Sequence, residues 1–292
     1  MSVRLSHSSK ETFNQCGLKW KLHYINKYRS RRTSSALLFG VSCDEALNTL
    51  LLTGNYAECE MVFTELWLQH QHSTLIDFYP SDTDASLLTL PTIMAIEAIT
   101  DDSKRAHALA WNTLLVKGVT MLRAYHTDIY PRIKKVISVQ EKISLVGVCE
   151  NGDETTSSIT GIIDAIVEME LDDGTIETVI LDNKTSSVPY PKNAISTKEQ
   201  TALYSIAKPE YSHVGFAILV KKQLGRTQLL IGKPPEELKQ KTLDNFVQVL
   251  EDIEAGKFQQ NRKSCKAYGS FCQFYSYCHG EGFSDDIYEK ID

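Results

Sequence analysis

The sequence predicts a mixed α/β fold, in which one mixed β-sheet is flanked by helices and preceded by a helical extension. Apolar residues recur at helical intervals over the first 130 residues, and three segments rich in Val and Ile follow over residues 135–183. The remaining elements are predicted in the order helix, two strands, helix, which is typical of a sheet covered by helices. With 42% hydrophobic and 23% charged residues, the 292-residue chain has an ordinary globular composition and enough apolar residues for a large core.

Four helices are predicted in the N-terminal part, over residues 5–28, 35–52, 56–71 and 104–130. The first is predicted to begin with a capping box, because Ser8 and Glu11 have the required spacing, and Leu5 is placed to act as a hydrophobic staple. Gly54 is expected to cap the second helix in the left-handed conformation. Residues 74–104 contain prolines and many small polar residues, which favours a loop or insertion with at most one short helix.

Strands are predicted over residues 135–148, 157–170, 176–183, 212–222 and 226–232, with a helix over 235–255. The Asp-Asp-Gly turn at 172–174 is expected to join the second and third strands as a hairpin. Another helix is expected to begin at Ser196, where Ser196 and Glu199 repeat the capping-box spacing. We expect one compact unit in three parts, namely residues 1–130, a sheet core of 131–260 and a cysteine-containing segment of 261–292.

Two aspartates and one lysine are expected to meet on this hairpin. Asp164 lies in one strand, and Asp182 and Lys184 end the next strand of the same hairpin. Side chains in a strand alternate between faces, so Asp182 and Lys184 point the same way. Two carboxylates can share a hard cation, and an adjacent amine can stabilise charge that develops during phosphodiester hydrolysis. On spacing alone, an ordinary surface ion pair explains these residues as well.

The hairpin resembles the core of the PD-(D/E)XK nuclease superfamily, in particular its RecB-like branch. That branch shows a Gly-x-x-Asp strand, a strand that ends in Asp-x-Lys-Thr, and then a helix with Gln-x-x-x-Tyr. The sequence has these in order as Gly161–Asp164, Asp182–Thr185, and Gln200 with Tyr204. The resemblance implies a restriction-endonuclease-like mixed sheet flanked by helices, with a helical N-terminal extension and a C-terminal cysteine cluster.

The resemblance extends to the front of the chain and excludes only the insertion at 74–104. The residues Leu5, Ser6, Cys16, Lys19 and Tyr24 are similar to the opening helix of the family, and Phe39, Gly40 and Asp44–Leu47 are similar to its second helix. Where the family commonly has a metal-binding histidine, this chain has Asp44. A carboxylate preserves ligation of a hard cation, so Asp44 either maintains the metal site or marks a weakened centre.

The resemblance also implies roles for the individual residues. Mg²⁺ or Mn²⁺ is expected to be bound by Asp44, Asp164, Asp182 and the backbone carbonyl of Asn183. Lys184 would orient or activate the attacking water, and Gln200 and Tyr204 would hold Lys184 or the scissile phosphate. Glu141, on the preceding strand, is a further acidic candidate, although an exposed position on the strand explains it better.

Seven cysteines without an evident leader sequence argue against a disulfide framework. Three lie close together as Cys265, Cys272 and Cys278, and Cys16 is the expected fourth member. This arrangement resembles AddB-type subunits and CRISPR-associated iron-sulfur exonucleases, which implies a structural 4Fe-4S cluster, although six residues separate Cys265 from Cys272 where those relatives usually have two. Zinc would satisfy the same thiolates, and free thiols are a third reading.

The remaining cysteines and the histidines carry no expected site. Cys43, Cys59 and Cys149 are expected to be small buried apolar residues. The eight histidines are too scattered along the sequence to indicate a site.

The net charge of −6 argues against a protein that coats nucleic acid through bulk charge, but it does not exclude an enzyme with a local basic patch. The densest basic stretch contains Lys19, Lys27, Arg29, Arg31 and Arg32, interleaved with aromatic residues. It fits DNA binding or a solvated helix face equally well. We found no leader sequence and no apolar stretch approaching about 20 residues, so we expect a cytoplasmic protein without a membrane partner.

The leading expectation is a Mg²⁺- or Mn²⁺-dependent DNA exonuclease that acts on single strands or duplex ends, in repair, recombination or mobile-element replication. Its expected partners are DNA and a helicase, a recombinase or another replication or repair protein. The alternative is a non-catalytic DNA-binding or assembly subunit that retains the fold. An iron-sulfur redox enzyme is disfavoured, because the sequence has no recognisable nucleotide or flavin motif.

Overall fold

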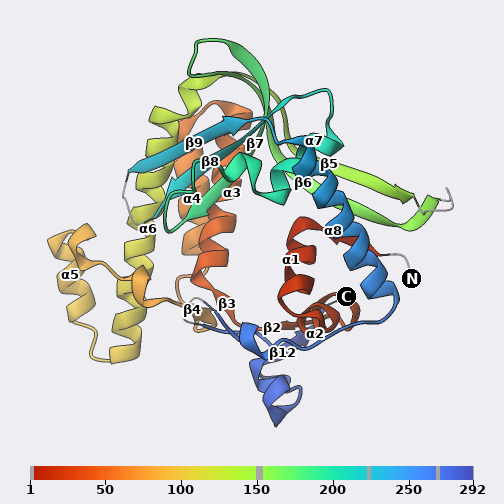
Figure 1. The fold of residues 1–292 in the computed structure, drawn as a ribbon. Coiled ribbons are helices and arrows are strands. Elements are labelled where there is room, and N and C mark those ends of the chain that lie inside the picture. The colour runs from red at the N-terminus through yellow and green to blue at the C-terminus, as the bar shows by residue number, and fades with distance from the viewer. Residues whose placement is uncertain (1–2, 149–153, 222–224, 268–269, 292) are drawn as a thin grey trace.

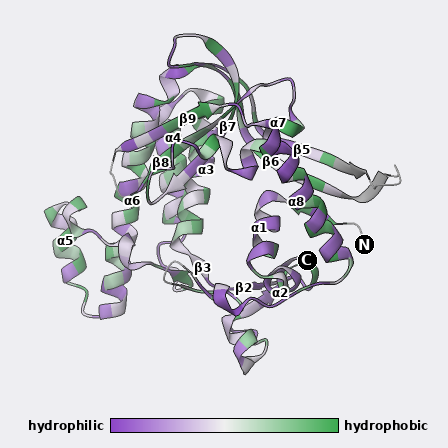
Figure 2. Cartoon of the chain, viewed as in Figure 1, coloured by the Kyte–Doolittle hydropathy of each residue, from purple (hydrophilic) through white to green (hydrophobic). Residues whose placement is uncertain are grey.

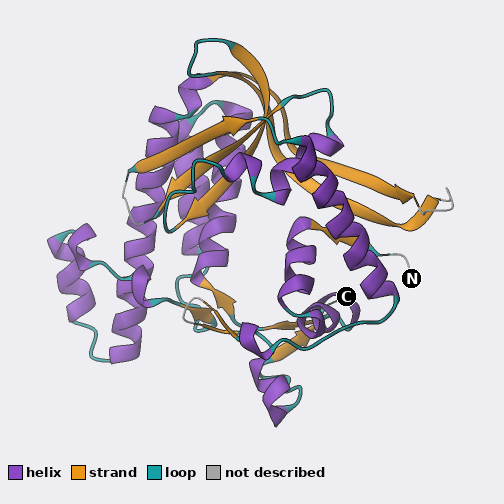
Figure 3. Cartoon of the chain, viewed as in Figure 1, coloured by secondary structure: helices purple, strands orange, loops and turns teal. Residues whose placement is uncertain are grey.

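A mixed β-sheet lies between two groups of helices in the computed structural model, which describes residues 3–148, 154–221, 225–267 and 270–291 (Figure 1, Figure 3). The strands of the sheet are β1 (Arg4–Ser6), β5 (Ile133–Val148), β6 (Glu154–Glu170), β7 (Ile176–Ser186), β8 (His213–Val220) and β9 (Arg226–Gly232). The helices are α1 (His7–Gln15), α2 (Gly17–Trp20), α3 (Ser35–Thr53), α4 (Tyr56–Leu68), α5 (Leu90–Glu97), α6 (Asp102–Asp128), α7 (Glu199–Ala207) and α8 (Glu236–Glu254).

Smaller elements connect these. The short strand pairs are β2 (Tyr28–Ser30) with β12 (Tyr288–Lys290), β3 (Thr33–Ser34) with β4 (Ile76–Asp77), and β10 (Lys266–Ala267) with β11 (Ser270–Phe271). Short 3₁₀ or π-helical turns cover Lys21–Ile25, Pro80–Asp82, Ala85–Leu87, Tyr130–Arg132, Ala194–Ser196, Arg262–Ser264 and Tyr277–Glu281. In Figure 1, α5 projects from the body of the protein on the turns that follow β4.

The long strand β6 organises the sheet. β5 pairs with β6 in the antiparallel direction along nearly all of its length, so β5 occupies one edge of β6. The other edge is shared, because β1 pairs in parallel with Ser158–Thr160 and β7 pairs antiparallel with Ala165–Glu170. Residues 161–164 lie between the two ladders, and none of the described strands pairs with them on that edge. This gap is where the expected Gly-x-x-Asp motif lies.

The two faces of the sheet are covered by different helices. One face carries the largest hydrophobic cluster, in which residues of β6, β7 and β8 pack with α3, α4 and α6. The opposite face packs against α1, α7 and α8. Apolar residues are accordingly concentrated in the central strands and in α3 and α4 (Figure 2).

The alternation of β6 side chains between the two faces of the sheet is interrupted at Asp164. Ile163 is buried in the cluster that contains Tyr204 of α7, whereas Ala165, two residues later, is buried in the cluster with α3, α4 and α6. Residues two apart in a regular strand share a face, so the strand is irregular between them. Gln140, which occupies the β5 position across from Asp164, has a left-handed φ of 55°. The aspartate therefore lies where the strand changes from one core to the other.

Helix α3 packs as a core helix beside the sheet. It ends at Gly54, whose φ of 70° is the expected left-handed cap. By length and composition alone it is also apolar enough to cross a membrane, with a mean hydropathy of 1.3, so the expectation of no such stretch was wrong. Nine of its residues are nevertheless buried in the protein, among them Phe39 and Cys43. A buried core helix passes the same test of length and composition as a membrane span.

Most expected elements agree with the structure, and two helix starts were wrong. The chain forms strand β1 before α1, and the N-cap is Ser6, which accepts from the backbone N–H of Ser9, so the Ser8 capping box does not form. Pairing of Leu5 with β6 decided this, since the strand buries Leu5 completely. The helix expected from Ser196 begins instead at Glu199, without a side-chain cap.

The two ends of the chain are adjacent in space. The backbone N–H of Leu18 donates to the carbonyl of Gln259, and β12 pairs with β2. Gly17 is close-packed against this segment, because a Cβ added there would lie 2.9 Å from the backbone nitrogen of Gln259. The C-terminal segment thus docks on α1 and α2. The expected division into three parts stays a prediction.

Candidate active site

Asp164 and Asp182 lie across from each other where β6 and β7 separate. The last registered pair of that ladder is Ala165 with Leu181, which places the two aspartates in the next position. Beyond this point β7 continues its pairing with β8 through Ser186. The backbone N–H of Asn183, freed from β6, donates to Asp164 Oδ2 at 2.8 Å. Separation of the strands therefore creates the space between the carboxylates and also fixes one of them.

Lys184 is paired with Asp182, as alternation along the strand predicted. Lys184 Nζ lies 2.7 Å from Asp182 Oδ2, and the side chain of Asp182 is only 1% exposed whereas that of Lys184 is 30% exposed. Burial acts to lower the pKa of Lys184, but the Asp182 carboxylate outweighs it and the net pKa is raised. The ammonium is therefore charged at neutral pH and faces the groove.

Gln200 and Tyr204 hold Asp182 from helix α7. Gln200 Nε2 donates to Asp182 Oδ1 and to the Tyr204 hydroxyl, each at 2.9 Å. The Tyr204 hydroxyl lies 2.9 Å from the Ile162 carbonyl and 3.1 Å from Asp182 Oδ1, either of which accepts its proton. Their side chains share one face of α7, as a spacing of four requires. In this structure the pair orients Asp182 and the open edge of β6, and its expected role of holding Lys184 or the scissile phosphate stays a prediction.

Asp44 of α3 approaches the same centre from the other side. It interacts electrostatically with both Lys184 and Asp182, and burial, together with Glu45, raises the pKa of its carboxyl group. Gln140 Nε2 lies 3.5 Å from Asp44 Oδ2 and 3.3 Å from Asn48 Oδ1. The residue that replaces the family histidine is therefore close to the carboxylate pair.

The crowding of carboxylates fits a divalent cation. Burial, followed by the charge of Asp182, raises the pKa of Asp164 to about 8. A group of three buried or half-buried aspartates with one lysine is unfavourable unless more positive charge is supplied. Oxygen ligands of this kind are those that Mg²⁺ and Mn²⁺ prefer. The donor set fits a cation held by Asp164, Asp182 and Asp44, and the role expected for the Asn183 carbonyl stays a prediction.

Two grooves meet at this centre. The larger, of about 880 Å³, runs from Asp182 and Tyr204 along β1, β5 and β6 to Arg4. The smaller, of about 350 Å³, lies against α3 and includes Asp44. Asp164 and Lys184 line both. A chain laid through the two grooves would pass directly over the carboxylates.

Two other groups of expected residues lie apart from the carboxylates. Glu141 accepts from Ser138 and is ion-paired with Lys208, which supports the exposed-strand interpretation. The basic stretch is largely neutralised: Arg29 and Arg31 pair with Glu289, Arg32 pairs with Asp77, and Lys19 donates to Gln15. Lys27 has a left-handed φ of 63° and accepts from the backbone N–H of Ile291 through its carbonyl. DNA binding by this stretch stays a prediction.

The structure brings the four expected cysteines into one region. Cys16 is buried at the start of α2, and Cys265, Cys272 and Cys278 are partly buried free thiols. Burial raises the pKa of Cys278, and the other three thiols add to this effect, so all four are close enough to interact. Cys43 and Cys59 are buried as expected, and Cys149 lies outside the described residues.

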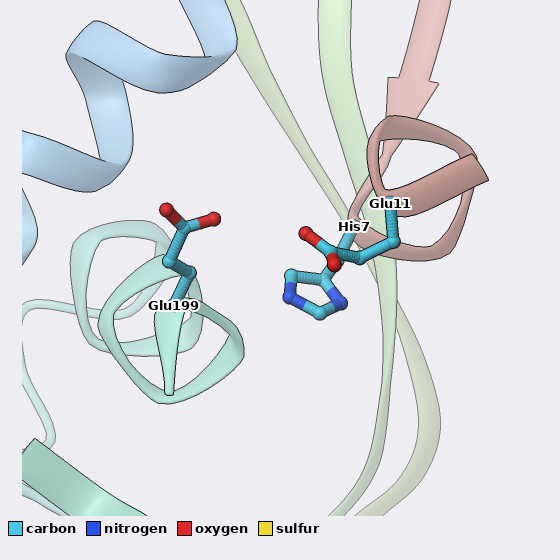
Figure 4. A group of neighbouring side chains, drawn as sticks. All are labelled: His7, Glu11 and Glu199. Atoms are coloured by element: carbon cyan, nitrogen blue, oxygen red, sulfur yellow. The ribbon is translucent and has the colours of Figure 1, made fainter. Parts of the chain in front are cut away.

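His7, to which no role was assigned from the sequence, lines the larger groove in the structure. His7 and Glu11 extend from α1 toward Glu199 of α7 (Figure 4), with ligand atoms within 4.8 Å of one another. The buried Lys10 pairs with both glutamates, and Asn245 donates to Glu199. The Lys10 ammonium therefore supplies the positive charge that these carboxylates need, without a metal ion. His7 directly follows Ser6 of the family-like opening motif, which was the available signal.

A mixed sheet that presents two aspartates and a lysine where two strands separate, supported by a Gln–Tyr helix, defines a nuclease-type hydrolase. The chain belongs to the PD-(D/E)XK nuclease superfamily, whose family model matches residues 4–279. The comparison with curated proteins gave no match. Among solved structures, "Crystal structure of SSO0001" is 15% identical, with a TM-score of 0.34, over 76% of this chain and 97% of that chain.

Proposed function

We propose that this nuclease is a Mg²⁺- or Mn²⁺-dependent DNA exonuclease that acts on single strands or duplex ends. The observation that carries the proposal is the buried pair of Asp164 and Asp182, with Lys184 beside it, at a gap in the sheet that opens into both grooves. A strand end is the preferred substrate in this proposal, because the side chain of Asp182 is only 1% exposed, which restricts the access of a rigid duplex. Repair, recombination or mobile-element replication are the settings that such an activity would serve.

In this proposal the two aspartates hold the cation, and neighbouring residues orient them. When bound, a hard divalent cation supplies Lewis acidity toward the phosphoryl group and lowers the pKa of a water molecule. Asp164 is fixed by the Asn183 amide, and Asp182 by Gln200 and Tyr204, so both carboxylates are oriented before substrate arrives. Such preorganisation avoids reorganisation during the reaction.

Lys184 has a separate role in this proposal. Its ammonium is paired with Asp182 on one side and is 30% exposed toward the grooves on the other. There it can donate to a non-bridging phosphate oxygen or to the attacking water, and stabilise negative charge that develops at phosphorus. Since the raised pKa maintains the ammonium in its charged form, Lys184 acts as a donor and not as a general base.

We also propose that Cys16, Cys265, Cys272 and Cys278 hold a structural 4Fe-4S cluster, in line with the iron-sulfur branch of the superfamily. The fit rests on four free thiols that interact electrostatically and come from both ends of the chain.

The partners and location follow from the same proposal. DNA is the substrate that the fold implies, and a helicase, recombinase or other replication protein would supply its ends. Action on intracellular DNA would place the protein in the cytoplasm of a bacterial or phage-infected cell. Immunoprecipitation of the tagged protein from its host, with sequencing of bound DNA, tests this setting.

The first experiment is degradation of end-labelled single-stranded and duplex DNA with Mg²⁺, Mn²⁺ or EDTA by anaerobically purified protein. We expect metal-dependent cleavage that Lys184→Ala abolishes. Lys208→Ala is the matched control, because Lys208 is also a lysine paired with a strand carboxylate but lies outside the grooves. No cleavage by the wild-type protein with its iron content intact would support the non-catalytic subunit instead. In that case the replacement of the family histidine by Asp44 would be the first cause to test.

A covalently closed single-stranded circle separates exonuclease from endonuclease action. We expect the circle to survive while a linear strand of the same sequence is degraded. Equal rates on both would overturn the exonuclease proposal and leave the nuclease class intact.

A further inference from the structure

The larger groove contains a row of polar side chains that leads away from Asp164. Along β6, Ser158, Thr160 and Ile162 line the groove, and they alternate with Ile159 and Ile163, which are buried beneath the helices. At about 3.3 Å per residue, Ser158 lies roughly 20 Å along the strand from Asp164. The sheet thus presents Ser158 and Thr160 to the groove, with the exposed Ile162 between them and Asp164.

Neighbouring strands widen this row with hydroxyl groups and cations. Ser6 of β1 and Ser144 of β5 are both registered with Thr160, so three hydroxyl side chains lie across the sheet at one level. Lys142 is registered with Ile162, nearer the carboxylates, and Arg4 with Ser158, at the far end. All of these residues line the groove.

The two cations of this row are exposed, and among the described residues neither Arg4 nor Lys142 forms an ion pair. In the same strand, Lys134 and Lys135 pair with Glu170 and Glu168. The larger groove therefore presents two exposed cations beside its row of hydroxyl groups. Free cations and hydroxyl donors in a row are what a phosphate backbone requires.

The smaller groove, on the other side of the carboxylates, has a different character. On its α3 wall, Leu37 and Val41 are 62% and 52% exposed. Among the described residues that line this groove there is no arginine, and Lys184 of β7 is the one lysine. Apolar side chains suit the face of a sugar or base better than a phosphate. The two sides of the scissile position are therefore unlike each other.

We propose that the row formed by Arg4, Ser6, Lys142, Ser144, Ser158 and Thr160, here named the β6 track, binds the phosphate backbone of a single nucleic-acid strand on one side of the scissile phosphate. The strand is held by its backbone and directed to Asp164, and the terminal nucleotide lies in the apolar groove beside α3. This inference rests on the proposed function, because it assigns the substrate path of the same centre.

Salt dependence of binding tests the track without any cleavage. Anisotropy of a fluorescein-labelled oligothymidylate is measured over a range of KCl concentrations in EDTA, for the wild type and for Arg4→Gln/Lys142→Gln. Each lost phosphate contact on a single strand reduces the slope of log K against log salt by about 0.7, so we expect the double variant to lower it by about 1.4. Lys135→Gln/Lys239→Gln removes two cations outside the grooves and should leave the slope unchanged.

A second variant guards against misfolding of the short strand β1. Ser144→Glu introduces a negative charge in the middle of the exposed track, and we expect it to weaken binding at least tenfold while thermal unfolding stays as in the wild type. An unchanged slope in the double variant, or unchanged affinity in Ser144→Glu, would overturn the track. Absence of any binding of the single strand by the wild type would overturn it too.

Failure of the β6 track and failure of the proposed function give different results. Cleavage by the wild type with no change in slope would retain the nuclease and reject the track. A reduced slope without cleavage would retain the track as a strand-binding surface and reject the catalytic proposal.

Discussion

The carboxylate centre and the cysteine region are held together in different ways. Asp182 is 1% exposed and accepts from Gln200, Tyr204 and Lys184, all of which come from the sheet or from α7 packed on it. The cysteine region joins the two ends of the chain, and its sulfur atoms have few partners, such as the Asn261 N–H that donates to Cys16 Sγ. The carboxylates are therefore oriented by contacts within the protein, whereas we propose that a cluster bound to its thiols stabilises the cysteine region.

This comparison teaches that the two regions use different sources of order. The hydrophobic core of β6, β7 and β8 packs through protein contacts, so it positions the aspartates in advance. The contact of Gln259 with Leu18 joins the chain ends through the backbone, and in the proposed cluster the thiols beside it would gain further interactions from the bound metal. Changes in the two regions should therefore affect different measurements.

The largest expected effect is on turnover by Asp182→Asn. The substitution retains the shape and the hydrogen bond from Gln200 but removes the charge that pairs with Lys184 and binds the cation. We expect the metal-dependent cleavage rate to fall by roughly 10³-fold or more. Single-turnover rates with saturating Mn²⁺ measure it, and circular dichroism checks the fold. A residual rate within tenfold of the wild type would mean that Asp182 is not at the reacting centre.

The next effect is on stability, through Cys265→Ser. If the thiols bind a cluster, this variant should lose most of its bound iron and about 3 kcal/mol of stability, or roughly 6–12 °C in Tm. Cleavage at low temperature should stay within tenfold of the wild type, since the carboxylate centre does not depend on the chain ends. Ser264→Ala is the adjacent control. A protein that contains no iron or zinc, with an unchanged Tm in the variant, would contradict the cluster.

Tyr204→Phe should have an intermediate effect on turnover. It removes only the hydroxyl that bridges Ile162 and Asp182, and groups that orient metal ligands typically contribute 10–100-fold. We expect a loss in that range, with weaker Mg²⁺ affinity and little change in Tm. Tyr211→Phe, on the loop after α7, is the matched control. An effect on Tm with none on turnover would assign Tyr204 to the core alone.

The smallest expected effect is the change in the free energy of unfolding per pH unit. Since burial raises the pKa of Asp164 from 3.8 to about 8, the folded protein retains a proton that the unfolded chain releases. The free energy of unfolding in EDTA should therefore fall between about pH 4 and 8, by at most about 1.4 kcal/mol per pH unit. Excess Mg²⁺ should flatten this slope, and Asp164→Asn should abolish the Asp164 contribution. Urea titrations measure it, and an identical slope in Asp164→Asn would refute the assignment.

Much of the fold was predictable because local signals were strong. The Gly54 cap, the Asp-Asp-Gly turn and the Val- and Ile-rich strands gave α3 and the hairpin nearly at their observed bounds. The capping boxes at Ser8 and Ser196 did not form, because Leu5 pairs with β6 and Glu199 turns to the buried Lys10. Tertiary burial outweighs a capping contribution of about 1 kcal/mol.

The sequence alone supplied the candidate chemistry: two aspartates, a lysine and a Gln–Tyr pair in the order of the superfamily, together with four cysteines that resemble its iron-sulfur branch. Alternation and turn length also set Lys184 beside Asp182, because both are local properties of a strand. Only the tertiary structure decided that β1 and β7 share one edge of β6 and leave residues 161–164 open. It likewise brought Asp44, Gln140 and His7 toward that opening, since contacts between distant segments depend on how the helices pack on the sheet and not on sequence spacing.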